Sequence, residues 1–292
     1  MTKIIFQIIS DIHLEFLPHY DPKQFFNKTD STEINLILAG DIGYPSDSKY
    51  VDFLEKCIKL YDNIFLITGN HEYYESRKNS KSIEEINQTI EDICQNLNLK
   101  YTQKLQNKLT DDNNLTDDNN LTDNKFGKIY FLNNKMILHN NIYIIGSTLW
   151  SYVKPEMTHT EKFINDYNYI KDFTLIESNK LYHLNRQFIS DSVELVRSAK
   201  ETNPDIKCLV ITHHLPSYEL IHPKYKSYSD INHFFASDMD DLISEPIDYW
   251  IYGHTHTASK DVINGVNLIC NPKGYPSELS KFDKKCIIEI DL

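Results

Sequence analysis

The chain has 292 residues and a formal net charge of −12, from 30 lysines and arginines against 42 aspartates and glutamates. Its 40% hydrophobic and 25% charged content is typical of a soluble globular protein, and the acidic balance makes nucleic acid an unlikely main ligand. No apolar run approaches the ~18 residues of a membrane span, and the opening segment is charged too early for a secretory signal. We therefore expect no membrane partner and a cytoplasmic location, where the five scattered cysteines stay reduced.

Short apolar runs rich in isoleucine and valine predict strands that are buried on both faces. In chain order they are Ile4–Ile9, Ile34–Ala39, Ile64–Thr68, Ile142–Gly146, Cys208–Thr212 and Tyr249–Tyr252. Near the end of the chain, Asn264-Gly265 predicts a tight hairpin turn between Asp261–Ile263 and Val266–Cys270. Cys286–Ile290 predicts a last strand.

Helical patterns lie between these runs. Ser48–Leu60 carries apolar residues at helical spacing between two predicted strands, so strand, crossover helix and parallel strand follow one another. Further helices are predicted at Ser82–Leu97, Asn179–Ala199 and His233–Ile243. This alternation indicates an α/β protein, and we expect one domain over residues 1–292.

One segment, roughly Thr102 to Gly127, has low sequence complexity. The hexapeptide Leu109–Asn114 repeats as Leu115–Asn120 and then begins again. Its few apolar side chains cannot offset the entropy of ordering the chain, which predicts a disordered surface insertion. The Asp-rich repeat lacks the glycine pattern of known calcium loops.

Polar side chains follow the ends of the predicted strands, three times directly after a glycine. The set is Asp11-Ile12-His13, Gly40-Asp41, Gly69-Asn70-His71-Glu72, His213-His214 and Gly253-His254-Thr255-His256. The first three groups are separated by about 30 residues, the length of a βαβ unit. Because parallel strands end at the same edge of a sheet, where ligands bind in open α/β folds, these side chains should meet there.

The residue types in this set indicate a metal centre. Two carboxylates, one amide oxygen and four imidazoles, with no thiol, suit Mn, Fe or Zn better than calcium or magnesium. A single tetrahedral zinc would leave several of these groups unused, whereas two metals that share one carboxylate would employ them all. Two-metal centres with ions about 3.5–4 Å apart are typical of phosphate ester hydrolysis.

The ordered motifs Asp-x-His, Gly-Asp, Gly-Asn-His-Glu, His and Gly-His-x-His resemble those of the calcineurin-like metallophosphoesterase superfamily. Asn165-Asp166-Tyr167 and Asn271–Tyr275 further resemble an uncharacterised bacterial-type group within it. The resemblance implies a four-layer α/β/β/α sandwich, with two mixed sheets flanked by helices and the site between them at the strand ends.

The resemblance also implies a role for each candidate residue. Two divalent metal ions (Mn, Fe or Zn) would be held, one by Asp11, His13 and His256, the other by Asn70, His213 and His254, with Asp41 as the bridge. His71 would be the general acid, and His214 a substrate-binding or a packing residue. Glu72 is equally compatible with an orienting and a structural role, and Asp166 could belong to a helix cap.

The implied activity is hydrolysis of a small phosphomonoester or phosphodiester, by attack of a hydroxide that bridges two metals, with His71 as proton donor. The superfamily's Ser/Thr phosphatases read Gly-Asp-x-x-Asp-Arg-Gly, where this chain has Gly40–Tyr44. The difference argues against a phosphoprotein phosphatase and leaves the group that orients His71 unidentified. The alternatives are a catalytically weak metal-binding scaffold of the same fold and a nuclease.

Overall fold

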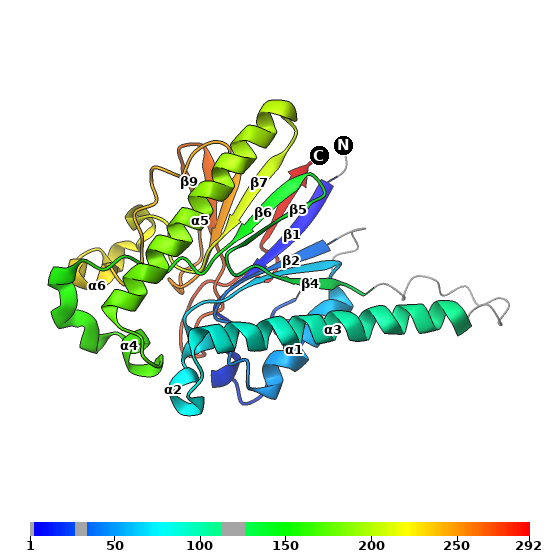
Figure 1. Cartoon of the computed structure of the whole chain (residues 1–292), viewed down its shortest axis with the longest axis horizontal. Coiled ribbons are helices and arrows are strands. Elements are labelled where there is room, and N and C mark those ends of the chain that lie inside the picture. The colour runs from blue at the N-terminus through cyan, green and yellow to red at the C-terminus, as the bar shows by residue number, and fades with distance from the viewer. Residues whose placement is uncertain (1–2, 27–33, 112–125) are drawn as a thin grey trace.

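The computed structural model describes residues 3–26, 34–111 and 126–292 and contains two β-sheets that pack against each other (Figure 1). The first sheet has the strand order β11-β1-β2-β3-β4, and all its neighbours are parallel except β11, which is antiparallel to β1. Its strands are β1 (Lys3–Ile9), β2 (Ile34–Ala39), β3 (Asn63–Ile67), β4 (Lys128–Phe131) and β11 (Ile287–Asp291).

The second sheet has the order β5-β6-β7-β8-β10-β9. Its four central strands are parallel, and the two edge strands, β5 and β9, are antiparallel to their neighbours. The strands are β5 (Lys135–His139), β6 (Ile142–Gly146), β7 (Lys207–Ile211), β8 (Tyr249–Tyr252), β9 (Ser259–Ile263) and β10 (Val266–Cys270). Both sheets are therefore mixed.

The buried core between the sheets is aliphatic and aromatic. Because side chains alternate across a strand, Phe6 and Ile8 of β1 face this layer while Ile9 faces the helices. Ile144 and Leu209 contribute to the same layer from the second sheet. At ~25 cal/mol per Å² of buried apolar surface, this inter-sheet layer supplies much of the stability that fixes the strand ends relative to one another.

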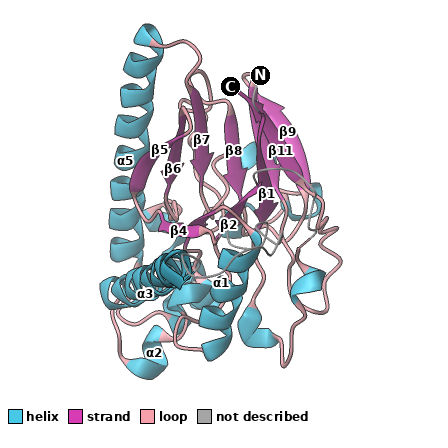
Figure 2. Ribbon diagram, turned by 90° about the vertical axis from the view of Figure 1, so that its right-hand side faces the viewer, coloured by secondary structure: helices cyan, strands magenta, loops and turns pink. Residues whose placement is uncertain are grey.

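Helices cover the outer faces of the two sheets (Figure 2). The helices α1 and α3 pack on the first sheet and α5 on the second, which gives the layer order helix, sheet, sheet, helix. The α-helices are α1 (Ser48–Leu60), α2 (Ser76–Asn79), α3 (Ile83–Asp111), α4 (Asn165–Tyr169), α5 (Leu175–Thr202) and α6 (Ser229–Asn232). Short 3-10 helices lie at Leu14–Phe16, Pro22–Gln24, His71–Tyr73, Pro155–Phe163, Tyr218–Leu220 and Pro223–Tyr225. The predicted α/β/β/α architecture is confirmed.

One predicted helix, His233–Ile243, is wrong. The segment is built of turns, with Ala236 forming an isolated parallel bridge to Leu215. The backbone N–H of Ser237 donates to Leu215, and that of Met239 donates to Pro216, so these groups bond outside the segment instead of within a helix. Its regularly spaced apolar residues are buried by this packing, which is why the pattern resembles a helical one.

The helix α3 is longer than its apolar spacing predicts. It continues through Asp111, so residues 102–111 of the predicted insertion are helical. The rest of the predicted insertion, apart from residues 126–127, lies outside the described residues. Within the described ranges, no helix combines the length and the apolar character that a membrane span requires.

The register of the parallel strands places their carboxyl ends side by side. Ile9 of β1 pairs with Leu38 of β2, and Ala39 pairs with Ile67 of β3. In the second sheet, Ile211 of β7 pairs with Ile251 of β8. The loops that leave these strands therefore start from one edge of the sandwich.

Candidate metal centre

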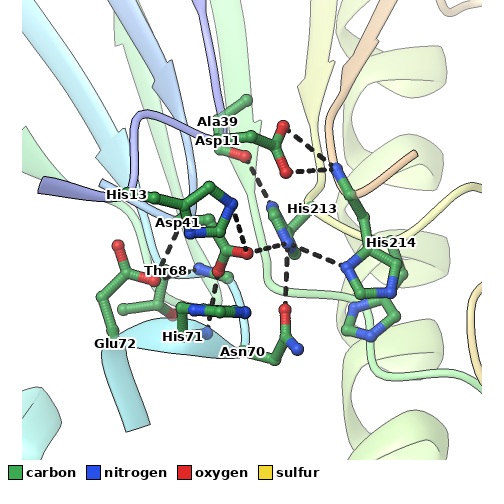
Figure 3. Close-up of polar contacts among 12 residues, drawn as sticks. Asp11, His13, Ala39, Asp41, Thr68, Asn70, His71, Glu72, His213 and His214 are labelled. Atoms are coloured by element: carbon green, nitrogen blue, oxygen red, sulfur yellow. Dashed lines mark hydrogen bonds and ion pairs between the residues drawn. The ribbon is translucent and has the colours of Figure 1, made fainter. Parts of the chain in front are cut away.

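The loops after five strands bring the predicted site residues together. Asp11 and His13 follow β1, Asp41 follows β2, and Asn70 and His71 follow β3. The second sheet contributes His213 after β7, and His254 and His256 after β8. Figure 3 shows Asp11, His13, Asp41, Asn70 and His213 turned towards one another from both sheets.

The first cluster contains Asp11, His13, Asp41 and His256, with one donor atom from each within 4.8 Å of all the others. His13 Nε2 lies 3.0 Å from His256 Nε2 and 3.8 Å from Asp41 Oδ2. His256 Nε2 lies 3.4 Å from Asp11 Oδ1. These are the four residues that the family resemblance assigns to one metal and its bridge.

The second cluster contains Asp41, His213 and His254 by the same criterion. His213 Nε2 is its central atom, at 3.3 Å from Asp41 Oδ2, 3.2 Å from Asn70 Oδ1 and 3.2 Å from His254 Nδ1. Asp41 belongs to both clusters, as expected of a bridging carboxylate.

The donor atoms of these clusters fit a bound cation because their lone pairs converge. His213 Nδ1 lies 2.9 Å from the carbonyl oxygen of Ala39, which can only accept, so the neutral ring carries its hydrogen on Nδ1. Its Nε2 lone pair then faces Asp41 and the amide oxygen of Asn70, which are also acceptors. Facing lone pairs repel one another unless a proton or a metal ion lies between them.

The same logic holds in the first cluster. His13 Nδ1 faces Glu15 Oε1 at 3.2 Å, and His256 Nδ1 faces Glu278 Oε2 at 2.6 Å. Each carboxylate accepts from Nδ1, so both Nε2 atoms present lone pairs towards each other and towards Asp11. The described residues therefore form a donor set that suits divalent cations with nitrogen and oxygen ligands.

Of the four candidate imidazole ligands, His213 and His256 have raised pKa values, whereas burial lowers the pKa of His13 and of His254. Burial disfavours a proton on His213, but the charges of Asp41 and Asp11 outweigh it and raise the pKa of His213 to about 10. Burial likewise opposes a proton on His256, while Asp11 and Glu278 raise the pKa of His256 to about 9. Since metal binding requires neutral imidazoles, a bound ion would take the place of these protons.

The backbone at the centre adopts a conformation that most residues avoid. Five of the seven candidate ligands have left-handed φ values between 48° and 68°: Asp11, His13, Asp41, His254 and His256. Asp and His enter this region more readily than most residues, but each such residue still costs ~1 kcal/mol or more. Gly40, with φ of 85°, permits a close approach of the chains, because a Cβ there would lie 2.6 Å from His213 Nδ1. Strain of this kind is typical of functional sites.

His71, the candidate general acid, is buried beside both clusters. Its backbone N–H donates to Asp41 Oδ1 at 2.8 Å, and its ring Nδ1 lies 2.9 Å from Glu15 Oε1. On the other side of the ring, Nε2 lies 3.0 Å from the hydroxyl of Tyr275. Burial alone would lower the pKa of His71, but Asp41 and Glu15 outweigh it and the pKa lies above its ordinary value.

Two further buried carboxylates hold the loops rather than the ring of His71. Glu72 accepts the backbone N–H groups of Gly69, Asp41 and Ile42 at 2.7–3.1 Å, which ties the loop after β2 to the loop after β3. Asp166 accepts from the side-chain amide of Asn70 at 2.8 Å. That bond fixes which end of the Asn70 amide faces His213.

His214 lies behind the second cluster. Its ring is fully buried against His254, with centroids 4.3 Å apart, and against Trp150 at 5.3 Å. Burial and the nearby His213 lower the pKa of His214 to about 3, so the ring is neutral. Of the two roles considered from the sequence, these contacts favour packing over substrate binding.

Sequence reasoning assigns no role at the centre to Glu15, Tyr275 or Glu278, although Tyr275 belongs to the motif Asn271–Tyr275. Glu15 has a signal, since it lies two residues after His13 in the same loop. Tyr275 and Glu278 do not follow a strand that carries a candidate ligand. They reach the centre through the long loop between β10 and β11, where the N–H of Tyr275 donates to Glu278 Oε2.

Two sheets flanked by helices, with a cluster of carboxylates and imidazoles at the strand ends, define a fold with a candidate metal site. The chain belongs to the calcineurin-like phosphoesterase family, whose sequence model matches residues 6–258. The family implies hydrolysis of phosphoesters and the use of divalent metals.

Three proteins are similar to this chain over nearly its whole length. An uncharacterized protein, L509, of Acanthamoeba polyphaga mimivirus is 31% identical over 306 residues, covering 98% of this chain and 97% of L509. The crystal structure of the phosphopantetheinyl hydrolase PptH from Mycobacterium tuberculosis aligns with a TM-score of 0.64 and 14% identity, covering 94% of this chain and 90% of PptH. The calcineurin-like phosphoesterase YfkN from Bacillus subtilis aligns with a TM-score of 0.38 and 12% identity, covering 92% and 81% of the two chains.

Proposed function

We propose that this chain is a binuclear metallophosphoesterase that hydrolyses a small phosphomonoester or phosphodiester. Asp11, His13 and His256 would hold one divalent ion, Asn70, His213 and His254 the other, and Asp41 would contact both. The observation that carries the proposal is the convergence of acceptor atoms on Asp41 Oδ2 and His213 Nε2. Divalent ions in such a centre neutralise phosphate charge and lower the pKa of water.

The chain's own residues complete the site. His71 lies against Asp41, with Nδ1 on Glu15 and Nε2 directed away from it, so Nε2 is the nitrogen available to give a proton to a departing alkoxide. A well-placed proton donor contributes about 10²–10⁴ in rate. Phe16, 47% exposed and with its ring centroid 6.1 Å from that of His71, offers an apolar surface beside the leaving group.

A small substrate agrees with the charge of the protein better than a nucleic acid does. The net charge of −12 repels long polyanions, whereas screening limits its effect to about 8–10 Å for a small phosphoester close to bound cations. A nuclease is therefore the weaker alternative. The other alternative is a non-catalytic scaffold, which the experiment below distinguishes from an enzyme.

The experiment measures hydrolysis of p-nitrophenyl phosphate, its bis ester and a cyclic nucleotide, with added Mn²⁺, Fe²⁺ or Zn²⁺ and again after chelation. We expect metal-dependent turnover of at least one substrate. In His71→Ala, with an unchanged metal content, turnover of the cyclic nucleotide, which has an alkoxide leaving group, should fall by about 10²-fold or more, and turnover of the p-nitrophenyl esters by less. His139→Ala is the matched control, because His139 pairs with Ile142 at the opposite end of the second sheet. Two tightly bound ions without turnover would indicate the scaffold.

A further inference from the structure

We propose that Glu15 is the positioning residue of His71, the carboxylate that holds the ring with Nε2 directed at the leaving group. The inference rests on the proposed function and extends it, because the family's motif that would supply an aspartate partner is absent from Gly40–Tyr44. Glu15 lies in the short 3-10 helix Leu14–Phe16, which directly follows His13. It thus comes from the first strand's loop, whereas His71 comes from the third.

The contact between Glu15 and His71 is short and buried. Oε1 of Glu15 lies 2.9 Å from Nδ1 of His71, and the two side chains are 4% and 6% exposed. A carboxylate oxygen accepts, so the hydrogen bond places a hydrogen on Nδ1. The second ring nitrogen, Nε2, is then held on the opposite side of the ring, where the hydroxyl of Tyr275 lies at 3.0 Å.

The same oxygen of Glu15 also faces Nδ1 of His13 at 3.2 Å. One carboxylate therefore orients a candidate metal ligand and the candidate proton donor together. The two rings pack edge to face with centroids 4.4 Å apart, and the ring of Tyr74 also packs on His71, with centroids 4.2 Å apart. Rotation of the His71 ring would break the bond to Glu15 and disturb both contacts.

The other buried carboxylates near His71 have different partners. Glu72 accepts three backbone N–H groups, and Asp166 accepts from Asn70 and from the hydroxyl of Tyr74. Asp41 receives the backbone N–H of His71 rather than its ring. Among the described residues, Glu15 is thus the carboxylate that is hydrogen-bonded to the ring of His71.

The proposed step is a single proton transfer. As the bond from phosphorus to the leaving oxygen breaks, the Nε2–H bond of the imidazolium breaks and a new O–H bond forms on the leaving group. The hydrogen on Nδ1 stays there and continues to donate to Glu15, and the ring becomes neutral. Glu15 takes no proton and touches no reacting atom, so its effect is exerted through the direction of Nε2.

The test compares two substrates that differ in their need for a proton donor. Phenyl phosphate has a poor leaving group, while p-nitrophenolate departs without much help. We expect Glu15→Ala to lower kcat for phenyl phosphate by about 10²-fold and for p-nitrophenyl phosphate by less than about 10-fold, with KM nearly unchanged. Glu15→Gln, whose amide oxygen still accepts from Nδ1, should recover most of this loss.

Glu278→Ala is the matched control. Glu278 contacts Nδ1 of the candidate ligand His256 in the same way that Glu15 contacts His13, but it has no bond to the ring of His71. We expect this control to lose activity equally on both substrates and to recover with excess Mn²⁺. In a His71→Ala background, Glu15→Ala should no longer change the ratio of the two rates, because the two residues act as one unit.

A second readout does not depend on turnover. In protein with ¹⁵N-labelled histidine, at a pH where the ring is neutral, the His71 signal should show a hydrogen on Nδ1, and Glu15→Ala should lose that signature. Equal losses on both substrates, full recovery with excess metal, or a His71 ring without hydrogen on Nδ1 would overturn the role of Glu15. If the unmodified protein hydrolyses neither substrate, the proposed function fails, and the ring signal alone then decides whether Glu15 orients His71.

Discussion

Replacing Asp41 by asparagine should remove both metal ions, because Asp41 is the residue shared by the two clusters. Its Oδ2 lies 3.3 Å from His213 Nε2 and 3.8 Å from His13 Nε2, so an ion held by either histidine contacts this carboxylate. Asparagine is preferable to alanine. It keeps an acceptor for the buried N–H of His71, which would otherwise be unpaired at a cost of about 1–3 kcal/mol.

The size of the effect follows from the lost charge. Two unit charges about 4 Å apart attract by about 4 kcal/mol at an effective dielectric constant near 20, and a divalent ion doubles that value. Desolvation of the carboxylate offsets part of the attraction. A net loss of at least about 3 kcal/mol for each ion remains, which weakens binding by about a hundredfold.

Equilibrium dialysis against Mn²⁺, followed by elemental analysis, measures the result directly. The unmodified chain should retain two ions and Asp41→Asn fewer than one at the same free Mn²⁺. Asp205→Asn, an exposed change next to the opposite end of β7, is the control and should retain two. Two ions retained by Asp41→Asn would refute the bridge, and loss of only one would assign Asp41 to a single cluster.

Three further changes probe other parts of the centre. A Cβ on Gly69 would lie 2.6 Å from His213 Nε2 and would also collide with Asp41 Oδ1, so Gly69→Ala should cut metal content and activity by more than about tenfold while the circular dichroism spectrum is retained. Asp166→Ala frees the Asn70 amide to rotate and should weaken one of the two ions by about 10–100-fold, seen as biphasic metal titration. Chelation of ions present at about 100 times their Kd should lower stability by about 2.7 kcal/mol per ion and Tm by several degrees; an unchanged Tm in calorimetry would contradict bound metal.

The strands that carry the site are predictable because they are buried on both faces. β1, β2 and β3 consist almost entirely of apolar residues, and their continuous runs mark them without any knowledge of their neighbours. β5 is different, since most of its residues are only partly buried or exposed at the sheet edge. Its apolar run, Met136–Leu138, is only three residues long between Lys135 and His139, and pairing with β6 is what makes it a strand.

The candidate ligands are predictable for a related reason. They follow strand ends directly, so the topology rule for parallel sheets is enough to group them. The hydrogen-bond partner of His71 is not predictable in this way. Glu15 and His71 are 56 residues apart and meet only when the loops after β1 and β3 fold over the same sheet edge. Tyr275 ends the motif Asn271–Tyr275, but that motif does not predict its contact with His71, which lies 204 residues away in the chain.

The carboxylates of the centre lie in three successive layers around the candidate metal sites. Asp11 and Asp41 face the convergent imidazoles, Glu15 and Glu278 lie behind those imidazoles, and Glu72 lies behind the loops. Burial, together with Asp41, raises the pKa of Glu72 to about 8, although backbone N–H groups favour its charged form. Without metal, the ionised carboxylates of this centre are balanced by the protons that the raised pKa values place on His213 and His256. Bound divalent ions would replace these protons with more positive charge, so we expect metal occupancy to raise the affinity for an anionic substrate as well as the turnover.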